Sequence, residues 1–234
     1  APEALETSAL GLLSPIPRPR KNVFCVGRNY KEHIIEGNIA QGRDPHLFPS
    51  HIELFTKAPT TMNGPGGVIP LHAGLTKILG YEAELALVIG KGGRDIATEE
   101  ATDAVFGYTI VNDVTARDVQ MRHQQWDMGK SFDTFCPMGP WIVTADAFDG
   151  TQAQLRCWVN DELRQEAHTK GLIFDVPTLI ETISRGITLI PGDVIATGTP
   201  AGVGMGMQPP RYLAAGDVVR IEVDGIGAIE NRFV

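Results

Sequence analysis

The sequence has few cysteines, few aromatic residues and no cluster of basic charge. Of its 234 residues, 3 are cysteines and 7% are aromatic, and 20 Lys and Arg stand against 28 Asp and Glu for a net charge of −8. Without clustered Lys and Arg, the chain lacks the surface that nucleic acids and anionic membranes require. An acidic protein with an anionic substrate must therefore gather positive charge locally, through a few basic side chains or a bound cation.

The three cysteines, Cys25, Cys136 and Cys157, are widely separated and lie among apolar residues. An odd number without paired spacing indicates reduced, buried thiols rather than a disulfide framework. No apolar stretch approaches the ~20 residues of a membrane helix, and Ala1–Leu13 has no signal-peptide pattern. We therefore expect a cytoplasmic protein that binds neither membrane nor nucleic acid.

Strand signals dominate the sequence, which contains 26 Gly and 16 Pro. Short segments rich in Val, Ile and aromatic residues are bounded by Gly, Pro, Asn or Asp, which is typical of strands and turns. The predicted strands are Asn22–Val26, Leu54–Lys57, Glu82–Ile89, Tyr108–Val114, Trp141–Thr144, Leu155–Asn160, Asp193–Ala196, Asp217–Val223 and Ala228–Phe233. The prediction is a mostly β (α+β) fold with a few short helices.

Three short helices are predicted from capping and stop signals. They cover residues 29–37, closed by Gly37, residues 98–105, and the segment from Asp175 to Gly186. Residues 39–53 are polar and interrupted by proline, so we expect a mobile loop there. Residues 1–21 are predicted to be an N-terminal extension with a proline-rich lead-in, and residues 22–234 the catalytic domain.

Two glutamates, Glu82 and Glu84, interrupt an otherwise apolar strand. Successive side chains of a strand point to opposite faces, so these two project to the same side. Asp113 ends the next apolar strand. Three oxygen ligands suit Mg²⁺ or Mn²⁺, although two glutamates at a solvated strand edge would look the same in the sequence.

His33 and Glu36 have a spacing that places both on one face of the first predicted helix. A carboxylate that orients a histidine is the arrangement of a general base. An exposed histidine beside an unrelated glutamate has the same spacing, so the pair alone leaves both interpretations open. The other histidines lack such a partner.

Gly129-Lys130-Ser131 resembles the end of a phosphate-binding loop. The earlier glycine that such a loop requires is missing, because no glycine lies between Gly107 and Gly129. A nucleotide-binding module is therefore excluded at this spacing, and Lys130 remains a cation in a turn.

Taken in order, five spaced motifs resemble the fumarylacetoacetate hydrolase family from about residue 22 to the C-terminus. They are Gly27-Arg28-Asn29-Tyr30-x-x-His33-x-x-Glu36, Tyr81-Glu-x-Glu-Leu85, Asn112-Asp113-Val-Thr-Ala-Arg117-Asp118-x-Gln120, Gln125-Trp126-x-x-Gly129-Lys130-Ser-Phe-Asp133, and Pro191-Gly-Asp-Val-Ile-x-Thr197-Gly-Thr199-Pro200-x-Gly-Val-Gly204.

The resemblance implies a β-roll-like mixed fold, a homodimer and a role for each matching residue. The metal ligands for Mg²⁺ (or Mn²⁺) would be Glu82, Glu84 and Asp113. His33 and Glu36 would activate water from a lid, and Lys130 would stabilise oxyanion charge. The substrate would be held by Arg28, Arg117, Gln120 and Thr199. The loop at residues 39–53 is longer than expected for the family, which leaves the distal end of the substrate open.

On this basis, the leading hypothesis is metal-dependent hydrolysis of a carbon–carbon bond in an acylpyruvate or related β-diketo acid such as fumarylpyruvate, as in the catabolism of aromatic compounds. An isomerase of a hydroxy-dienedioate and a decarboxylase of oxaloacetate would use the same site. The retained pair His33 and Glu36 favours attack by water. A non-catalytic dicarboxylate-binding protein is disfavoured, because such a protein is expected to have lost part of this residue set.

Overall fold

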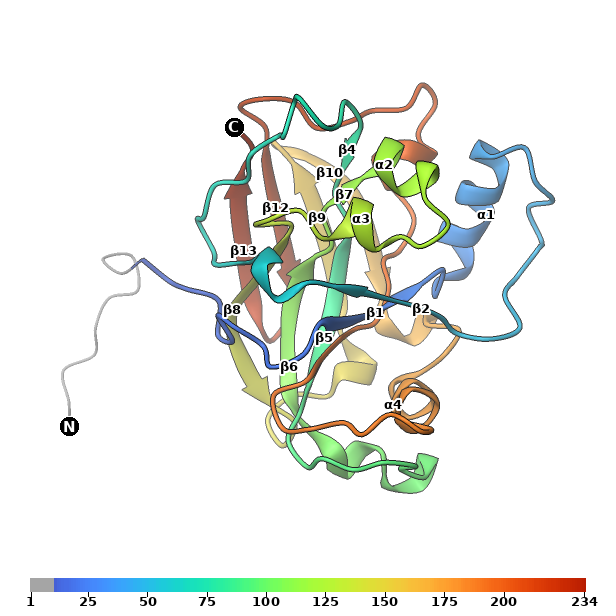
Figure 1. Ribbon diagram of the computed structural model, residues 1–234, viewed down its shortest axis with the longest axis vertical. Coiled ribbons are helices and arrows are strands. Elements are labelled where there is room, and N and C mark those ends of the chain that lie inside the picture. Colours follow the sequence, from blue (N-terminus) through green and yellow to red (C-terminus); the bar gives the residue numbers. More distant parts are fainter. Residues whose placement is uncertain (1–10) are drawn as a thin grey trace.

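The computed structural model describes residues 11–234, so the first ten residues of the predicted N-terminal extension lie outside the description. Two sheets dominate it (Figure 1), one with strand order β2-β1-β11-β5-β6-β8-β3 and one with β10-β9-β12-β13, beside a β4-β7 pair. The strands are β1 (Val23–Gly27), β2 (Glu53–Lys57), β3 (Met62–Asn63), β4 (Leu79–Gly80), β5 (Ala83–Ile89), β6 (Val105–Asn112), β7 (Thr115–Ala116), β8 (Cys136–Thr144), β9 (Gln154–Val159), β10 (Glu162–His168), β11 (Val194–Ala196), β12 (Val218–Val223) and β13 (Gly227–Arg232). The predicted mostly β fold is confirmed.

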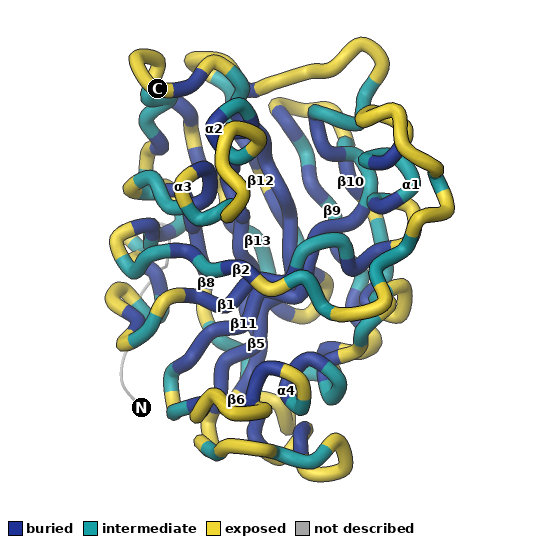
Figure 2. Tube along the Cα trace, turned by 45° about the vertical axis from the view of Figure 1, so that its right-hand side comes forward, coloured by how far each residue is buried: buried dark blue, intermediate teal, exposed yellow. Residues whose placement is uncertain are grey.

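The core lies between the two sheets, whose strands are largely dark blue in Figure 2, the colour of buried residues. Strand β5 is buried at every position, whereas β9 alternates between buried and half-buried residues. This difference follows from position, because β5 is central in the larger sheet and both of its faces are covered. Buried Leu85 and Leu87 of β5 belong to the same apolar cluster as Ile221 of β12 and Ile229 of β13.

The helices differ in part from the prediction. Helix α1 (Lys31–Ala40) continues past Gly37, so this glycine does not end it. Asn29 does not cap α1, because its side chain bonds the backbone of Phe174 and Thr197 instead. The helix predicted at residues 98–105 is wrong: two 3₁₀ turns occupy Thr98–Glu100 and Thr102–Ala104, and β6 begins at Val105.

Helix α4 (Val176–Ser184) agrees with its prediction, and Asp175 caps it by accepting from Thr178 N. Helices α2 (Arg117–Arg122) and α3 (Asp127–Lys130) were not expected from the sequence. Figure 1 shows α1, α2 and α3 gathered at one end of the larger sheet and α4 at the other. The end that carries α1, α2 and α3 is where β5 begins and β6 finishes.

The predicted loop at residues 39–53 is shorter than expected at both ends, because α1 runs to Ala40 and β2 starts at Glu53. The three cysteines are free and buried, as predicted. Within residues 11–234, no helix combines the length and the apolar character needed to cross a membrane.

Candidate active site

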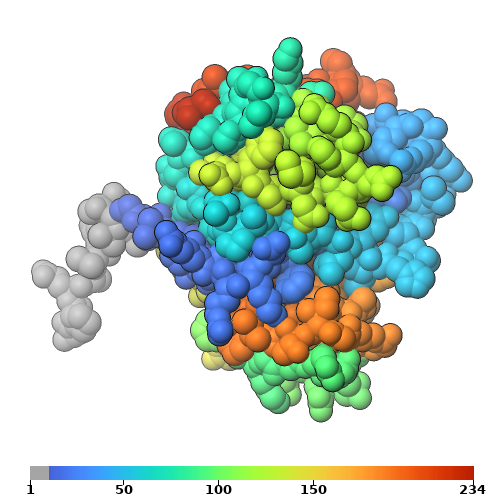
Figure 3. All heavy atoms as spheres, in the orientation of Figure 1, coloured from blue at the N-terminus to red at the C-terminus, as the bar shows by residue number. Residues whose placement is uncertain are grey.

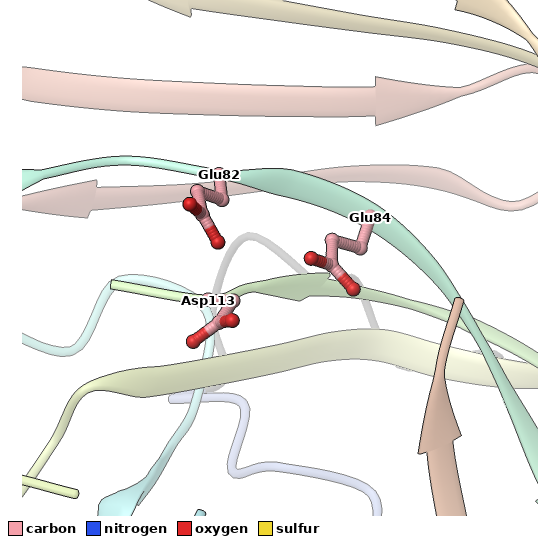
Figure 4. Close-up of side chains that lie close together, drawn as sticks. All are labelled: Glu82, Glu84 and Asp113. Atoms are coloured by element: carbon pink, nitrogen blue, oxygen red, sulfur yellow. The ribbon is translucent and has the colours of Figure 1, made fainter. Parts of the chain in front are cut away.

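The three predicted metal ligands converge where β5 and β6 pair. Glu82 directly precedes β5, Glu84 is its second residue, and Asp113 follows β6. The antiparallel register places Ala83 opposite Asn112, which brings the carboxylates together. Figure 4 shows the three groups around a common space, and one oxygen of each lies within 4.8 Å of the others. All three residues are buried, so the alternative of a solvated strand edge is excluded.

Three buried basic side chains contact two of these carboxylates. Lys130, the last residue of α3, bonds Glu82 Oε2 at 2.7 Å and Asp113 Oδ2 at 2.6 Å. Lys57 at the end of β2 bonds Asp113 Oδ1 at 2.6 Å. Arg117, the first residue of α2, forms an ion pair with Glu82. Among the described residues, no cation lies within ion-pair distance of Glu84, whose Oε2 accepts from Gly198 N at 2.9 Å.

The carboxylates differ in electrostatics because of this uneven pairing. Burial acts to raise the pKa of Glu82, but the positive charges of Arg117 and Lys130 outweigh it and hold that pKa below its ordinary value. Burial raises the pKa of Glu84, and the charges of Asp113 and Glu82 raise it further. The ionised form of Glu84 is therefore the one that lacks a compensating positive charge, and a set of three carboxylates with one unpaired member fits a divalent cation such as Mg²⁺ or Mn²⁺.

The predicted dyad is formed on α1, where His33 Nδ1 lies 2.9 Å from Glu36 Oε1. The other oxygen of Glu36 accepts from Gly202 N at 2.9 Å. Both side chains are mostly shielded from solvent, with 13% of His33 and 18% of Glu36 exposed. The unrelated-neighbour interpretation of this pair is therefore excluded by its geometry.

His33 and two of the predicted metal ligands, Glu82 and Glu84, line one cavity of ≈ 500 Å³. Its walls come from β1, α1, the following loop, and α2 and α3. In the space-filling view of Figure 3, the blue segment with α1 and its loop lies beside the yellow-green segment with α2 and α3. The cavity therefore brings a candidate base and a candidate cation site to the same small space.

Lys130 and the four residues predicted to bind substrate also line this cavity, whereas Glu36 and Asp113 are not among its lining residues. The predicted substrate-binding residues differ in how many intramolecular hydrogen bonds their side chains make. Arg117 donates to Gln120 Oε1 at 3.1 Å, which holds both residues together. Thr199 Oγ1 donates to Ala83 O at 3.0 Å and accepts from Gln165 at 2.8 Å. Arg28 has a left-handed backbone conformation, with φ 52°, and its guanidinium makes hydrogen bonds to other residues of the protein.

The Arg28 guanidinium fastens the loop beside the cavity. It donates to Glu53 Oε1 at 3.0 Å, to Asn38 Oδ1 at 3.3 Å and to Leu47 O at 2.7 Å. The predicted contact of Arg28 with the substrate would therefore form in addition to these three intramolecular hydrogen bonds.

Several residues of the site were missed by the sequence analysis. A lysine at the end of an ordinary strand gives no sign that it is buried, so Lys57 was not found. Gly202 acts through its backbone N–H, which no side-chain pattern shows. Arg43 lines the cavity from the loop and, within the described part of the chain, its guanidinium has no hydrogen-bond or ion-pair partner. The expected polar character of that loop was its only signal.

Comparison with known proteins identifies similar enzymes. Residues 22–234 match the family described as Fumarylacetoacetate (FAA) hydrolase C-terminal. The chain is 48% identical over 227 residues to oxaloacetate tautomerase YisK of Bacillus subtilis, covering 97% of this chain and 74% of the relative. It is 44% identical over 233 residues to the mitochondrial oxaloacetate tautomerase fahd2 of Xenopus laevis, covering 98% and 70%.

Two solved structures share the fold. The fumarylacetoacetate hydrolase from Exiguobacterium antarcticum has a TM-score of 0.85 and 51% identity, covering 94% of this chain and 77% of that chain. The maleylpyruvate hydrolase from Sphingobium sp. SYK-6, in complex with manganese(II) ion and pyruvate, has a TM-score of 0.78 and 36% identity, covering 98% and 76%.

Proposed function

The chain belongs to the fumarylacetoacetate hydrolase family, and on that premise we propose that it is a metal-dependent keto–enol tautomerase of a small 2-oxo dicarboxylic acid such as oxaloacetate. The observation that carries the proposal is the hydrogen bond between Glu36 and His33, together with the position of His33 in the wall of the cavity that Glu82 and Glu84 also line. Tautomerisation removes a proton from oxygen and adds one at carbon. No bond between heavy atoms breaks, so one well-placed base serves the reaction.

Glu36 orients His33 so that the remaining ring nitrogen is available as the base. In the direction from enol to keto form, Nε2 of His33 takes the proton of the enol hydroxyl and then delivers it to C3 of the substrate, which leaves the histidine neutral again. In the reverse direction, the same nitrogen takes the proton from C3. A neutral histidine exchanges protons readily near neutral pH, which suits both directions.

Basic side chains at the cavity match a substrate with two carboxylates. Burial acts to lower the pKa of Lys130, but Asp113 and Glu82 raise it above its ordinary value, so Lys130 stays a cation. Arg117 supplies a second buried cation, and Arg43 lines the cavity from the loop without an ion-pair partner in residues 11–234. Glu82, Glu84 and Asp113 would hold a divalent cation, which when bound supplies positive charge that polarises a 2-oxo group.

Hydrolysis, which the sequence analysis preferred, is the second candidate. The pair His33 and Glu36 can activate water for hydrolysis, but it equally serves proton transfer at carbon. The two tautomerases among the similar proteins support the isomerase alternative, and the similarity to a maleylpyruvate hydrolase keeps cleavage as the competing reaction.

To test the proposal, the enol form of oxaloacetate is diluted into buffer that contains the enzyme and either Mg²⁺ or EDTA, and the loss of enol absorbance is followed. A parallel reaction with acetylpyruvate measures the release of pyruvate. We expect metal-dependent acceleration of the enol decay without pyruvate release above background. Rapid cleavage of acetylpyruvate with no effect on the enol would instead establish the hydrolase.

A further inference from the structure

Both carboxylate oxygens of Glu36 have a partner, and one of the partners is backbone. Oε1 pairs with His33 Nδ1 at 2.9 Å, and Oε2 accepts from Gly202 N at 2.9 Å. We propose that the turn at residues 202–206 is a positioning element that fixes Glu36 and thereby sets the tautomer of His33. The proposal deepens the proposed function and rests on it for the role of His33 as the base.

The turn is held rigidly where it meets α1. The carbonyl of Gly202 accepts from the hydroxyl of buried Tyr81 at 2.8 Å, which ties the turn to the residue before Glu82. Gly202 has φ +99°, and a Cβ there would lie 1.8 Å from Arg164 O, so the position requires glycine. The Gly202 N–H that donates to Glu36 is therefore held in place by the contacts of Gly202 with Tyr81 and Arg164.

The fit between the turn and Glu36 is close. Gly206 has no Cβ, and an added one would lie 2.8 Å from both Cδ and Oε2 of Glu36. Gly206 has an ordinary φ, so alanine is tolerated by the backbone at this position but not by the space beside Glu36. The absence of this one methyl group lets the carboxylate lie between the turn and His33.

The tautomer of His33 follows from the hydrogen-bonding properties of the Glu36 carboxylate. An ionised carboxylate only accepts hydrogen bonds, so His33 Nδ1 must carry the proton that it shares with Oε1. Nε2 then has a free lone pair and is the ring nitrogen that can act as a base. The N–H of Gly202 holds Oε2 and thereby keeps Oε1 of the ionised carboxylate against Nδ1, which favours this tautomer.

A Glu36→Gln variant tests the arrangement directly, because its amide has one acceptor and one donor end. The fixed N–H of Gly202 donates to the amide oxygen of the glutamine, so the NH₂ group must face His33. Nδ1 becomes an acceptor and the proton moves to Nε2. In ¹⁵N-histidine-labelled protein above neutral pH, ¹⁵N NMR distinguishes the protonated ring nitrogen from the unprotonated one, and His33→Gln identifies the signal.

We expect the Nδ1–H form in the wild type and the Nε2–H form in Glu36→Gln. If Glu36→Gln keeps Nδ1–H, the amide oxygen faces His33, Gly202 does not govern Glu36, and the proposal is overturned. The measurement needs neither metal nor substrate. A failure of the tautomerase assay would therefore refute the proposed function and leave this result intact.

Gly206→Ala provides a second test at a residue that touches no substrate. We expect the displaced Glu36 to give mixed His33 tautomers and a kcat reduced about 10-fold or more, with KM changed less than about 3-fold, because loss of a general base acts on the chemical step. Gly74→Ala is the matched control, because an added Cβ there has nothing within 4 Å. A folded Gly206→Ala protein with the wild-type tautomer and kcat would contradict the proposal.

Discussion

At the scale of single residues, the fully buried ammonium of Lys57 stabilises the acidic site. It bonds Asp113 and the backbone carbonyls of Val114 and Lys130, and its side chain has 0% exposure. Removing one partner of a buried ion pair leaves the other charge poorly compensated. We expect Lys57→Met to lower the free energy of unfolding by about 3 kcal/mol, as measured by urea denaturation of the metal-free protein.

The exposed Lys91 provides the control, because Lys91→Met should change stability by less than about 0.5 kcal/mol. Equal stability of Lys57→Met and wild type would show that Asp113 does not depend on Lys57. Sequence reasoning missed this lysine for a physical reason: whether a cation at a strand end is buried depends on what packs over it. The same limit does not apply to Glu82 and Glu84, whose common face follows from strand alternation alone.

At the scale of elements, Asp118 joins α2 to the loop that precedes β4. It accepts from Thr76 Oγ1 and from the N–H groups of Lys77 and Val119. Burial acts to raise the pKa of Asp118, but these hydrogen bonds outweigh it and hold the pKa below its ordinary value. The ionised carboxylate therefore stabilises the fold above the unfolded-state pKa of ~3.9, and this stabilisation is lost as the pH falls through the lower folded-state pKa.

Asp118→Asn should accordingly reduce the free energy of unfolding at neutral pH by about 1 kcal/mol, the usual net contribution of such a hydrogen bond. The difference from wild type should shrink as the pH falls below ~4. Chemical denaturation at a series of pH values measures both effects, with exposed Asp103→Asn as the control. A difference that grows towards low pH would contradict the sign of the argument.

Arg28 fastens the loop that follows α1 and borders the cavity, through its contacts with Asn38, Leu47 and Glu53. Lysine keeps the charge but cannot make this set of forked contacts. We expect Arg28→Lys to speed amide hydrogen exchange several-fold across residues 38–47 in the ligand-free protein. Arg18→Lys, at an exposed position, should leave that exchange unchanged. Unaltered exchange in Arg28→Lys would indicate that Arg28 acts on the substrate alone.

Element prediction succeeded where local chemistry decides the structure and failed where packing does. Asp175 begins α4 as its capping pattern predicts. Helix α1 continues through Gly37, because a glycine inside a helix costs only about 1 kcal/mol. The packing of α1 against the turn at residues 202–206 depends on tertiary structure and could not be predicted from the local sequence. Strand β10 was missed because Glu162–His168 is mostly polar and becomes a strand by pairing with β9.

At the scale of the whole molecule, the acidic chain concentrates charge in one cavity. Lys57, Lys130 and Arg117 balance the three carboxylates in number, yet Glu84 has no cationic partner among residues 11–234. A divalent cation together with a dianionic substrate would add no net charge to this interior. The order of the motifs revealed the family from the sequence, whereas the choice between hydrolysis and tautomerisation depends on a substrate position that motif spacing does not determine.

The proposed cation site at Glu82, Glu84 and Asp113 exists only after β5 and β6 pair, so Mg²⁺ bound there should stabilise the folded protein. At a Mg²⁺ concentration of 100 times Kd, the expected stabilisation is about 2.7 kcal/mol, seen as a rise in Tm. EDTA should reverse it. Glu84→Gln should abolish the response, whereas exposed Glu99→Gln should retain it. An equal rise in Tm for wild type and Glu84→Gln would place the cation elsewhere.

The most direct test of the proposed function is the side from which carbon receives its proton. Enol oxaloacetate is converted in D₂O with Mg²⁺, and the keto product is reduced at once by malate dehydrogenase and NADH, so that ¹H NMR reports the configuration of the deuterated C3 of malate. If His33 delivers the deuteron from its fixed position on α1, one C3 configuration predominates with wild type, and both form equally with His33→Ala. Equal amounts of both with the wild-type enzyme, or cleavage of the substrate in place of deuterium transfer, would contradict the account.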